Sequence, residues 1–225
     1  MNSPASDYIR VWDLPTRLFH WALVALIALQ YASGEFGWLP MAWHYWLGYA
    51  TLALILFRVL WGFAGSETSR FGDFVRGPRA VFRYIADSLH GRVVHMPGHN
   101  PLGSWSALLM LGSVALQAVS GLFTSDDISE AGPWVERMSE ATVSLMTRIH
   151  HLNRYVLLLL IVLHVGAVLL HWVIRNDNLV APMLHGQARF DRVRTLRFVS
   201  SWRALFLLAL SAGAVWALVA WGSAS

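Results

Sequence analysis

Residues 150 to 171, HHLNRYVLLLLIVLHVGAVLLH, form a long apolar run that also contains four histidines. About 20 consecutive apolar residues cross the hydrocarbon core of a membrane as a helix, so this run predicts a transmembrane helix. An imidazole in hydrocarbon costs free energy unless a partner binds it. The fold of the chain must therefore supply partners for these histidines.

Five segments of the chain are long and apolar enough to span a membrane: 18–34, 43–65, 105–123, 143–174 and 202–221. Apolar residues make up 56% of the chain and charged residues 13%, which is typical of a protein in lipid and not of a soluble domain. We expect an all-α integral membrane bundle of four helices, followed by a fifth, C-terminal transmembrane helix. A short interfacial helix is predicted at about residues 78–90.

The arginines predict the orientation in the membrane, because the chain has no lysine. Arginines precede the first span and crowd the 66–101 and 175–197 segments, whereas the 35–42 loop has none and the 124–141 loop has only Arg137. The positive-inside rule then places the N-terminus in the cytoplasm and the C-terminus outside. The first 17 residues do not resemble a signal peptide, so we expect the first span to stay uncleaved. The net charge of +4 reflects this topology and gives no reason to propose nucleic acid.

The chain contains no cysteine. This excludes covalently attached haem, iron–sulfur clusters and disulfides, so an iron cofactor would be held by other side chains. We recognise no internal repeat in the sequence.

The depths of four histidines predict two pairs. A helix advances about 1.5 Å and 100° per residue, so His150 and His164 share one face at depths about 21 Å apart. Ligands of one small metal ion lie a single turn apart, and this spacing instead fits two stacked cofactors. His20 lies near the inner end of its span and His44 near the outer end of its span. Depth therefore pairs His44 with His150 and His20 with His164.

Four histidines on three helices, paired at two levels, match two haem b groups in a helical bundle. Ligation by two histidines leaves no open iron position, which favours electron transfer over oxygen chemistry. Two alternatives remain open from the residues alone. The histidines could be satisfied core residues, or they could relay protons in a haem-free proton- or ion-coupled transporter.

Three further histidines receive other interpretations. His151 is turned about 100° away from the shared face, so we expect an interfacial residue without a metal. His171 reaches either a haem propionate or a lipid headgroup. His185 lies in a linker, where we expect it to be solvated.

The segment before the third span contains His90, His95 and His99, which follow no helical register, so we do not predict a metal cluster there. Within GHNP, Asn100 fits an N-cap and Pro101 the first helical position, and together they predict the start of the third span.

Four motifs resemble the bacterial cytochrome b-561 family, which includes the b-type cytochrome subunits of nickel–iron hydrogenases: VWDLPTRLFHW, WHYWLGYATLALILFRVLWGF, GHNPLGSW and HHLNRYVLLLLIVLHV. The resemblance covers residues 8–186. It implies a four-helix protein of the bacterial inner membrane, with two b haems that pass electrons between the quinone pool and a redox partner. The family's ligand histidines fall on His20, His44, His150 and His164.

With this resemblance, the chain divides into a cytoplasmic segment (1–16), a dihaem domain (17–186) and a linker with the fifth helix (187–225). The small residues LSAGA of that helix are expected to pack either against the bundle or against a second copy in a homodimer. We interpret the chain as an electron carrier between quinone and a periplasmic c-type cytochrome or hydrogenase. Some relatives oxidise superoxide and reduce quinone on the same scaffold, and this is the alternative.

The outer 124–141 loop is acidic. Five carboxylates face the single Arg137: Asp126, Asp127, Glu130, Glu136 and Glu140. Ordinary solvation of a loop explains this charge, but an acidic surface above the outer haem would also attract a basic partner.

Arg58 interrupts the apolar second span fourteen residues after His44, so it lies on nearly the same face and one haem layer deeper. A guanidinium at this depth needs a partner. We favour a propionate of the inner haem over a simple positive-inside anchor.

Overall fold

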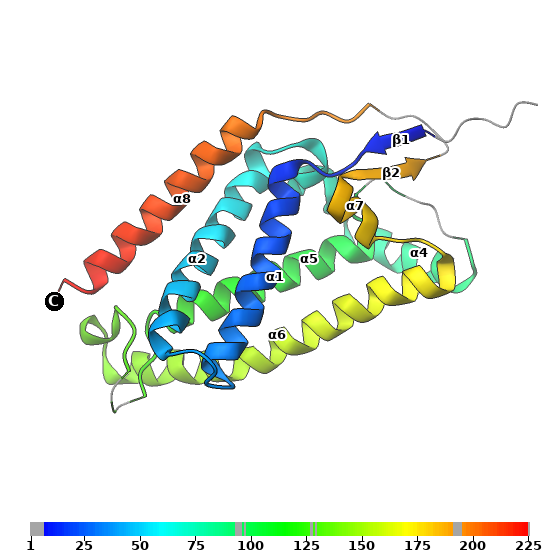
Figure 1. The fold of residues 1–225 in the computed structure, drawn as a ribbon. Helices are drawn as coiled ribbons and strands as arrows, with labels where there is room; N and C mark the ends of the chain where they lie inside the picture. Colours follow the sequence, from blue (N-terminus) through cyan, green and yellow to red (C-terminus); the bar gives the residue numbers. More distant parts are fainter. Residues whose placement is uncertain are drawn as a thin grey trace, which may run out of the picture.

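The computed structural model describes residues 7–92, 96, 98–126, 128, 130–190 and 195–224, and helices dominate this part of the chain (Figure 1). The long helices are α1 (Leu14–Gly34), α2 (Met41–Ala64), α5 (Pro101–Gly121), α6 (Glu140–Arg175) and α8 (Ser201–Gly222). The shorter ones are η1 (Glu67–Ser69), α3 (Phe71–Phe74), α4 (Pro78–Leu89), η2 (Val135–Arg137) and α7 (Val180–His185). The all-α fold class is confirmed, and each predicted span coincides with a helix.

Among the helices that the structure describes, α2, α5, α6 and α8 are long and apolar enough to cross a membrane. Helix α1 has the same length as α5, 21 residues. It is less apolar because Arg17, His20 and Gln30 lie within it. The multi-pass helical character is confirmed, and the crossing of the membrane by α1 stays a prediction.

Side-chain caps fix where two of these helices begin. Asp13 caps α1, because its Oδ1 accepts a hydrogen bond from the Thr16 amide at 2.8 Å. Asn100 caps α5 in the same way, with its Oδ1 2.7 Å from the Gly103 amide, and Pro101 is the first helical residue. The predicted start of the third span is confirmed.

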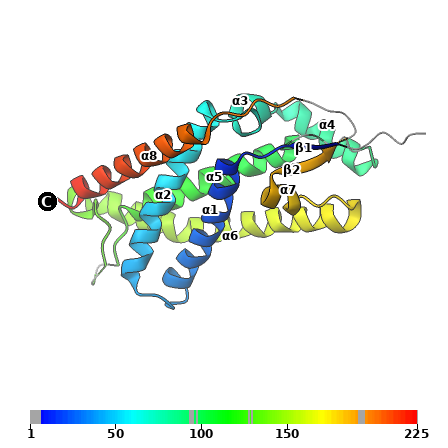
Figure 2. The same cartoon turned by 45° about the horizontal axis from the view of Figure 1, so that its top comes forward.

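Helix α2 lies at the centre of the bundle and packs against α1, α5 and α8. Figure 1 shows α1, α2 and α8 side by side with α5 and α6 running across them, and the turned view in Figure 2 agrees. Helix α6 packs along α5, and its direct contacts with α1 and α2 are few. The backbones that carry the paired histidines are therefore held apart.

The small-residue segment LSAGA of α8 (residues 210–214) packs against the bundle on one side only. Ser211 is buried where α8 packs on α2, whereas a Cβ at Gly213 would meet nothing within 4 Å. The packing of this segment against the bundle is thus one of the two expected alternatives. A homodimer through the open side stays a prediction.

Two apolar clusters form the core. One joins α1, α2 and α8 through Phe19, Phe57, Trp61 and Ala204. The other joins α2, α5 and α6 through Ile55, Val114 and Leu157. Leu157 lies seven residues from both His150 and His164 along α6. The second cluster is therefore an apolar layer between the two histidine levels.

A small sheet links the segment before α1 to the segment after α7. Strand β1 (Asp7–Arg10) pairs antiparallel with β2 (Gln187–Phe190). The amides of Val11 and Trp12 continue this contact by donating to the Gly186 carbonyl. These strands were not predicted, because runs of four residues carry too little alternation to be recognised. Residues 1–6, Arg192 and Arg194, which entered the topology prediction, lie outside the described residues.

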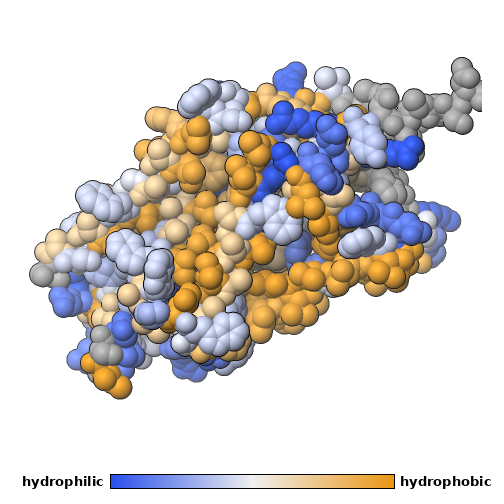
Figure 3. Space-filling view, viewed as in Figure 1, coloured by the Kyte–Doolittle hydropathy of each residue, from blue (hydrophilic) through white to orange (hydrophobic). Residues whose placement is uncertain are grey.

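The surface is apolar around the middle of the bundle and hydrophilic towards its ends (Figure 3). Large exposed side chains of α6, such as Leu159, Val162 and Leu163, contribute to the apolar band. Helix α4 occupies the predicted position of the interfacial helix and exposes Phe82 and Leu89. Its place at the membrane surface stays a prediction.

Candidate functional site

His44 and His150 face each other across one cavity between α1, α2, α5 and α6. Their ring centroids lie 6.3 Å apart, and both rings line the cavity. Two imidazoles that bind one metal ion from opposite sides, each with a nitrogen about 2 Å from the metal, place their centroids about 6 Å apart. The pair predicted from depth is brought together at a spacing that fits one iron.

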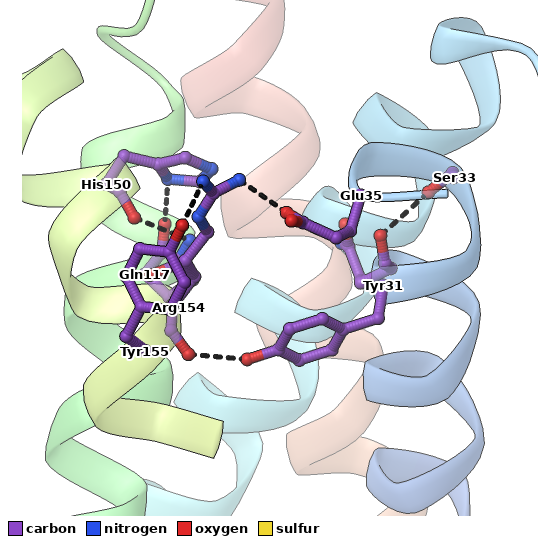
Figure 4. Close-up of polar contacts among 8 residues, drawn as sticks. Tyr31, Ser33, Glu35, Gln117, His150, Arg154 and Tyr155 are labelled. Carbon is purple, nitrogen blue, oxygen red and sulfur yellow. Dashed lines mark hydrogen bonds and ion pairs between the residues drawn. The ribbon is translucent and has the colours of Figure 1, made fainter. Parts of the chain in front are cut away.

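The Nδ1 atoms of both rings already have hydrogen-bond partners. The Nδ1 of His44 lies 3.1 Å from Ser33 Oγ. The Nδ1 of His150 lies 3.0 Å from the Gln117 carbonyl oxygen (Figure 4) and 3.3 Å from Ser120 Oγ. An Nδ1–H that donates to these oxygens leaves the Nε2 lone pair available, as metal-binding histidines require.

Glycines make room for both rings. A Cβ at Gly34 would lie 2.7 Å from Cε1 of His44, and a Cβ at Gly121 would lie 3.1 Å from Cε1 of His150. Any larger residue at Gly34 would collide with the ring that it faces. The donor atoms and this space fit a haem ligated by two histidines.

A buried amide network joins α5 to α6 next to His150. Asn153 Nδ2 donates to the Ser113 carbonyl at 2.9 Å and to Gln117 Oε1 at 2.8 Å. Gln117 Nε2 in turn donates to the His150 carbonyl at 3.1 Å. These residues were not predicted to be functional, although an Asn and a Gln in apolar spans are a usable signal.

An ion pair and a hydrogen bond tie α1 to α6 beside the same cavity. Arg154 Nη1 pairs with Glu35, and Tyr31 Oη donates to the Arg154 carbonyl at 2.6 Å (Figure 4). Arg154 Nη2 also donates to Tyr155 Oη at 2.7 Å. These contacts join helices whose backbones otherwise make few contacts, so they hold this end of the cavity together.

The acidic outer loop reaches this cavity. Asp126 and Glu130 line it together with Glu35, and Asp126 Oδ1 accepts from the Glu130 amide at 2.8 Å. Asp127 lies outside the described residues. His151 is exposed, and its ring centroid lies 6.1 Å from that of His150.

His20 and His164 lie at the other histidine level and interact electrostatically with each other. Both also interact with His99. The Nδ1 atoms of His20 and His99 are buried and have no hydrogen-bond partner within the part of the chain that the structure describes. The structure thus brings the second predicted pair into one neighbourhood and adds His99, which the sequence pattern had only placed in a loop.

His99 packs between two aromatic rings. Its ring centroid lies 4.9 Å from that of Trp12 and 4.5 Å from that of Phe74. Burial first, and then the nearby charges of Arg58, His164 and His20, lower the pKa of His99 to about 3. The His99 imidazole is therefore neutral at pH 7.

Arg58 is buried near His99, with 4% of its surface exposed. Its guanidinium carbon lies 5.1 Å from the centroid of Phe71 and 5.8 Å from that of Phe74. The carboxylate of Asp13 interacts with it electrostatically. Nη1 is buried and has no hydrogen-bond partner among the described residues. A buried cation with an unused donor suits an anionic group such as a carboxylate.

The remaining histidines lie apart from these two levels or at their edge. His171 Nδ1 lies 3.7 Å from Asp177 Oδ2, a partner that neither expected alternative named. His185 is exposed at the end of α7, as predicted. His90 Nδ1 lies 2.7 Å from the Ala86 carbonyl oxygen, and His95 lies outside the described residues.

Comparisons with known proteins identify the family of the chain. The sequence profile of the family described as prokaryotic cytochrome b561 matches residues 11–186. A probable Ni/Fe-hydrogenase B-type cytochrome subunit of Cupriavidus necator is 24% identical over 80% of this chain and 86% of its own length. A protein of the same description from Azotobacter chroococcum is 21% identical over 81% of this chain and 89% of its own length. No solved structure matches the chain.

Proposed function

We propose that this chain carries electrons across the bilayer with two haems. It belongs to the prokaryotic cytochrome b561 family and is a haem b protein of membrane electron transfer. The observation that carries this proposal is the opposed pair His44 and His150, whose centroids are 6.3 Å apart. Haem b supplies reversible one-electron chemistry when it is bound. The residues of the chain hold it, orient it and set its electrostatic surroundings.

In this proposal His44 and His150 bind the iron of one haem through their Nε2 atoms. We refer to this place as the outer site. Ser33, Ser120 and the Gln117 carbonyl hold the Nδ1 protons. With two histidines as ligands, the iron would have no open position for oxygen, and the site would favour electron transfer.

His20 and His164 bind the second haem, at what we call the inner site. Arg58 supplies the positive charge that holds a propionate there, which matches its buried and unused Nη1. His99 lies between Trp12 and Phe74 and provides a neutral Nδ1 near the same propionate. The apolar layer of Ile55, Val114 and Leu157 keeps water out of the space between the two sites.

We place the outer site on the periplasmic side of the inner membrane, with a cytoplasmic N-terminus and a periplasmic C-terminus, and α1 and α8 as further spans. Quinone reacts at one membrane face, and a periplasmic redox protein exchanges electrons at the outer site. The relatives named as hydrogenase cytochrome subunits support a hydrogenase as this partner, and a c-type cytochrome is the alternative.

The charge at the outer cavity favours a protein partner over superoxide. Asp126 and Glu130 line this cavity, and the nearby cation Arg154 is already paired with Glu35. A carboxylate-lined approach repels the superoxide anion and attracts a basic protein surface. Superoxide oxidation is therefore the second candidate, and a haem-free transporter has no support from the family.

The proposal is tested on the purified wild-type protein. We expect b-type absorption bands on reduction and two haems per chain, with reduction by a quinol analogue faster than reduction by superoxide. One haem per chain, or the absence of b-type bands, would overturn the dihaem proposal. Faster reduction by superoxide would favour the superoxide oxidase.

A further inference from the structure

Two five-residue segments at the ends of different helices repeat one pattern. Helix α1 ends with Gln30, Tyr, Ala, Ser33 and Gly34, and α5 ends with Gln117, Ala, Val, Ser120 and Gly121. Both read Q-x-x-S-G. Sequence analysis recognised no repeat, because five residues with three identities do not stand out in two apolar helices. The structure gives the repeat a meaning, since each copy contacts one histidine of the outer site.

The serines of the two copies make matching hydrogen bonds. Ser33 Oγ donates to the Leu29 carbonyl at 2.9 Å, and Ser120 Oγ donates to the Leu116 carbonyl at 2.7 Å. Each hydroxyl proton is thus used within its own helix. The oxygen lone pairs then accept from the Nδ1–H of the facing histidine, at 3.1 Å for His44 and 3.3 Å for His150.

The glutamine backbones also match. The Gln117 carbonyl lies 3.0 Å from the Nδ1 of His150, and the backbone of Gln30 lies close to the ring of His44. Each imidazole therefore meets one serine hydroxyl and one glutamine backbone. Both partners favour the tautomer with the proton on Nδ1.

The glycines complete the two copies. A Cβ at Gly34 would lie 2.8 Å from the Nδ1 of His44, and a Cβ at Gly121 would lie 3.3 Å from the Nδ1 of His150. Each histidine ring occupies the space that a side chain at the glycine position would fill. The requirement for glycine is local, because Gly112, also on α5, has open space around its Cβ position.

We infer that Gln30–Gly34 and Gln117–Gly121 are two copies of one histidine cradle, which fix both axial ligands of the outer haem as Nδ1–H tautomers in equivalent surroundings. Each copy lies on the first helix of a helical hairpin and supports a histidine on the second, α1 for α2 and α5 for α6. Ser33, Gly34, Ser120 and Gly121 are positioning residues, because they act through the histidines. This inference rests on the proposed binding of haem by His44 and His150.

The hydrogen bonds to the two histidines should affect the midpoint potential of the outer haem. A hydrogen bond from Nδ1–H makes an imidazole a stronger electron donor to the metal, which stabilises the oxidised iron. Removal of either serine hydroxyl should therefore raise the midpoint potential of the outer haem. The two changes should have the same direction, and the backbone partners that remain should keep the haem bound.

The test compares four single variants of the full-length protein in detergent: Ser33→Ala, Ser120→Ala, Gly34→Ala and Gly121→Ala. Haem content, the low-spin electron paramagnetic resonance signals of the oxidised protein and the midpoint potentials are measured. We expect both serine variants to keep two haems, with an altered outer-haem signal and a raised outer potential. Gly34→Ala should lose the outer haem. In Gly121→Ala, where the contact with the histidine ring is longer, the signal of the outer haem should be shifted or lost.

Matched controls separate the cradle from general packing. Ser211→Ala removes a buried hydroxyl that bonds its own helix at 2.8 Å, and Gly112→Ala adds a methyl group to α5 in open space. Both should keep two unaltered haem signals. Unaltered signals in all four cradle variants would overturn the inference, as would an effect confined to one copy. If His44→Ala also kept both haems, the proposed function itself would fail.

Discussion

The outer and inner sites hold their histidines in opposite ways. At the outer site, the Nδ1 atoms of His44 and His150 lie within hydrogen-bond distance of oxygen atoms, and carboxylates line the cavity. At the inner site, the Nδ1 of His20 is buried without a partner among the described residues, and the guanidinium of Arg58, whose charge Asp13 partly offsets, lies near His99. One site places hydrogen-bond acceptors and an excess of carboxylates near its ligands, and the other places a buried arginine nearby.

This difference predicts different redox properties for two haems of the same chemical type. Oxygen acceptors on Nδ1 and nearby carboxylates stabilise oxidised iron and lower a midpoint potential. A buried arginine stabilises the reduced state and raises it. We therefore expect the outer haem to have the lower potential.

The largest effect should come from removal of an axial ligand. His44→Ala or His150→Ala should remove the outer haem, and His20→Ala or His164→Ala the inner one, so that each variant keeps one haem of two. The haem content per chain is measured by absorption after extraction. His151→Ala is the control and should keep both, because this side chain is exposed. Loss of the outer haem from His151→Ala, with retention in His150→Ala, would reverse the ligand assignment.

A smaller effect, again confined to the outer site, is expected from Asn153→Ala. The change removes the donors to Ser113 and Gln117, and the loss of a buried hydrogen-bond network costs about 1–3 kcal/mol. Thermal unfolding followed at the haem absorption should shift to lower temperature, and the signal of the outer haem should broaden. Asn178→Ala, which removes an exposed amide that accepts from the start of α7, should leave the outer haem unchanged. Equal effects of the two variants would contradict a local role for Asn153.

Arg58→Leu should change the inner site alone. If the guanidinium lies about 8 Å from the haem iron, with an effective dielectric constant near 20, its charge stabilises the reduced iron by about 2 kcal/mol. That energy corresponds to an upper limit of about 90 mV for a one-electron couple. Asp13 offsets part of the charge, so we expect the inner potential to fall by tens of millivolts. A redox titration with both potentials unchanged and both haems present would return Arg58 to the role of a membrane anchor.

The smallest effect concerns docking at the outer site. Neutralisation of Asp126, Asp127 and Glu130 together should slow association with a basic partner such as a c-type cytochrome and flatten its dependence on salt. Stopped-flow reduction at several ionic strengths measures this. The same rate as wild type at low salt would leave the acidic loop with a solvation role only.

Depth along helices was enough to predict the outer pair, because helical rise and twist follow from the backbone alone. The helical character of the chain and the cap at Asn100 are confirmed for the same reason: each depends on local sequence or on hydropathy. The apposition of His44 and His150 also follows from depth, although iron binding by them stays a proposal.

The cradle residues could not be predicted, because their roles depend on which helices pack together. In the sequence, Ser33 and Ser120 are ordinary small residues in apolar spans. Their contacts with histidines arise only because α1 packs against α2 and α5 packs against α6. The pairing of β1 with β2 and the electrostatic interaction of His99 with His20 and His164 have the same origin, since they join segments far apart in the chain.

The most direct test of two independent haem sites is a spectrally resolved redox titration of the wild-type protein, His44→Ala and His20→Ala. Our account predicts two one-electron waves in the wild type. His44→Ala should lack the wave at lower potential, and His20→Ala the wave at higher potential. If the two variants lost the same wave, or if His44→Ala lost the higher one, the assignment of the two sites would be contradicted.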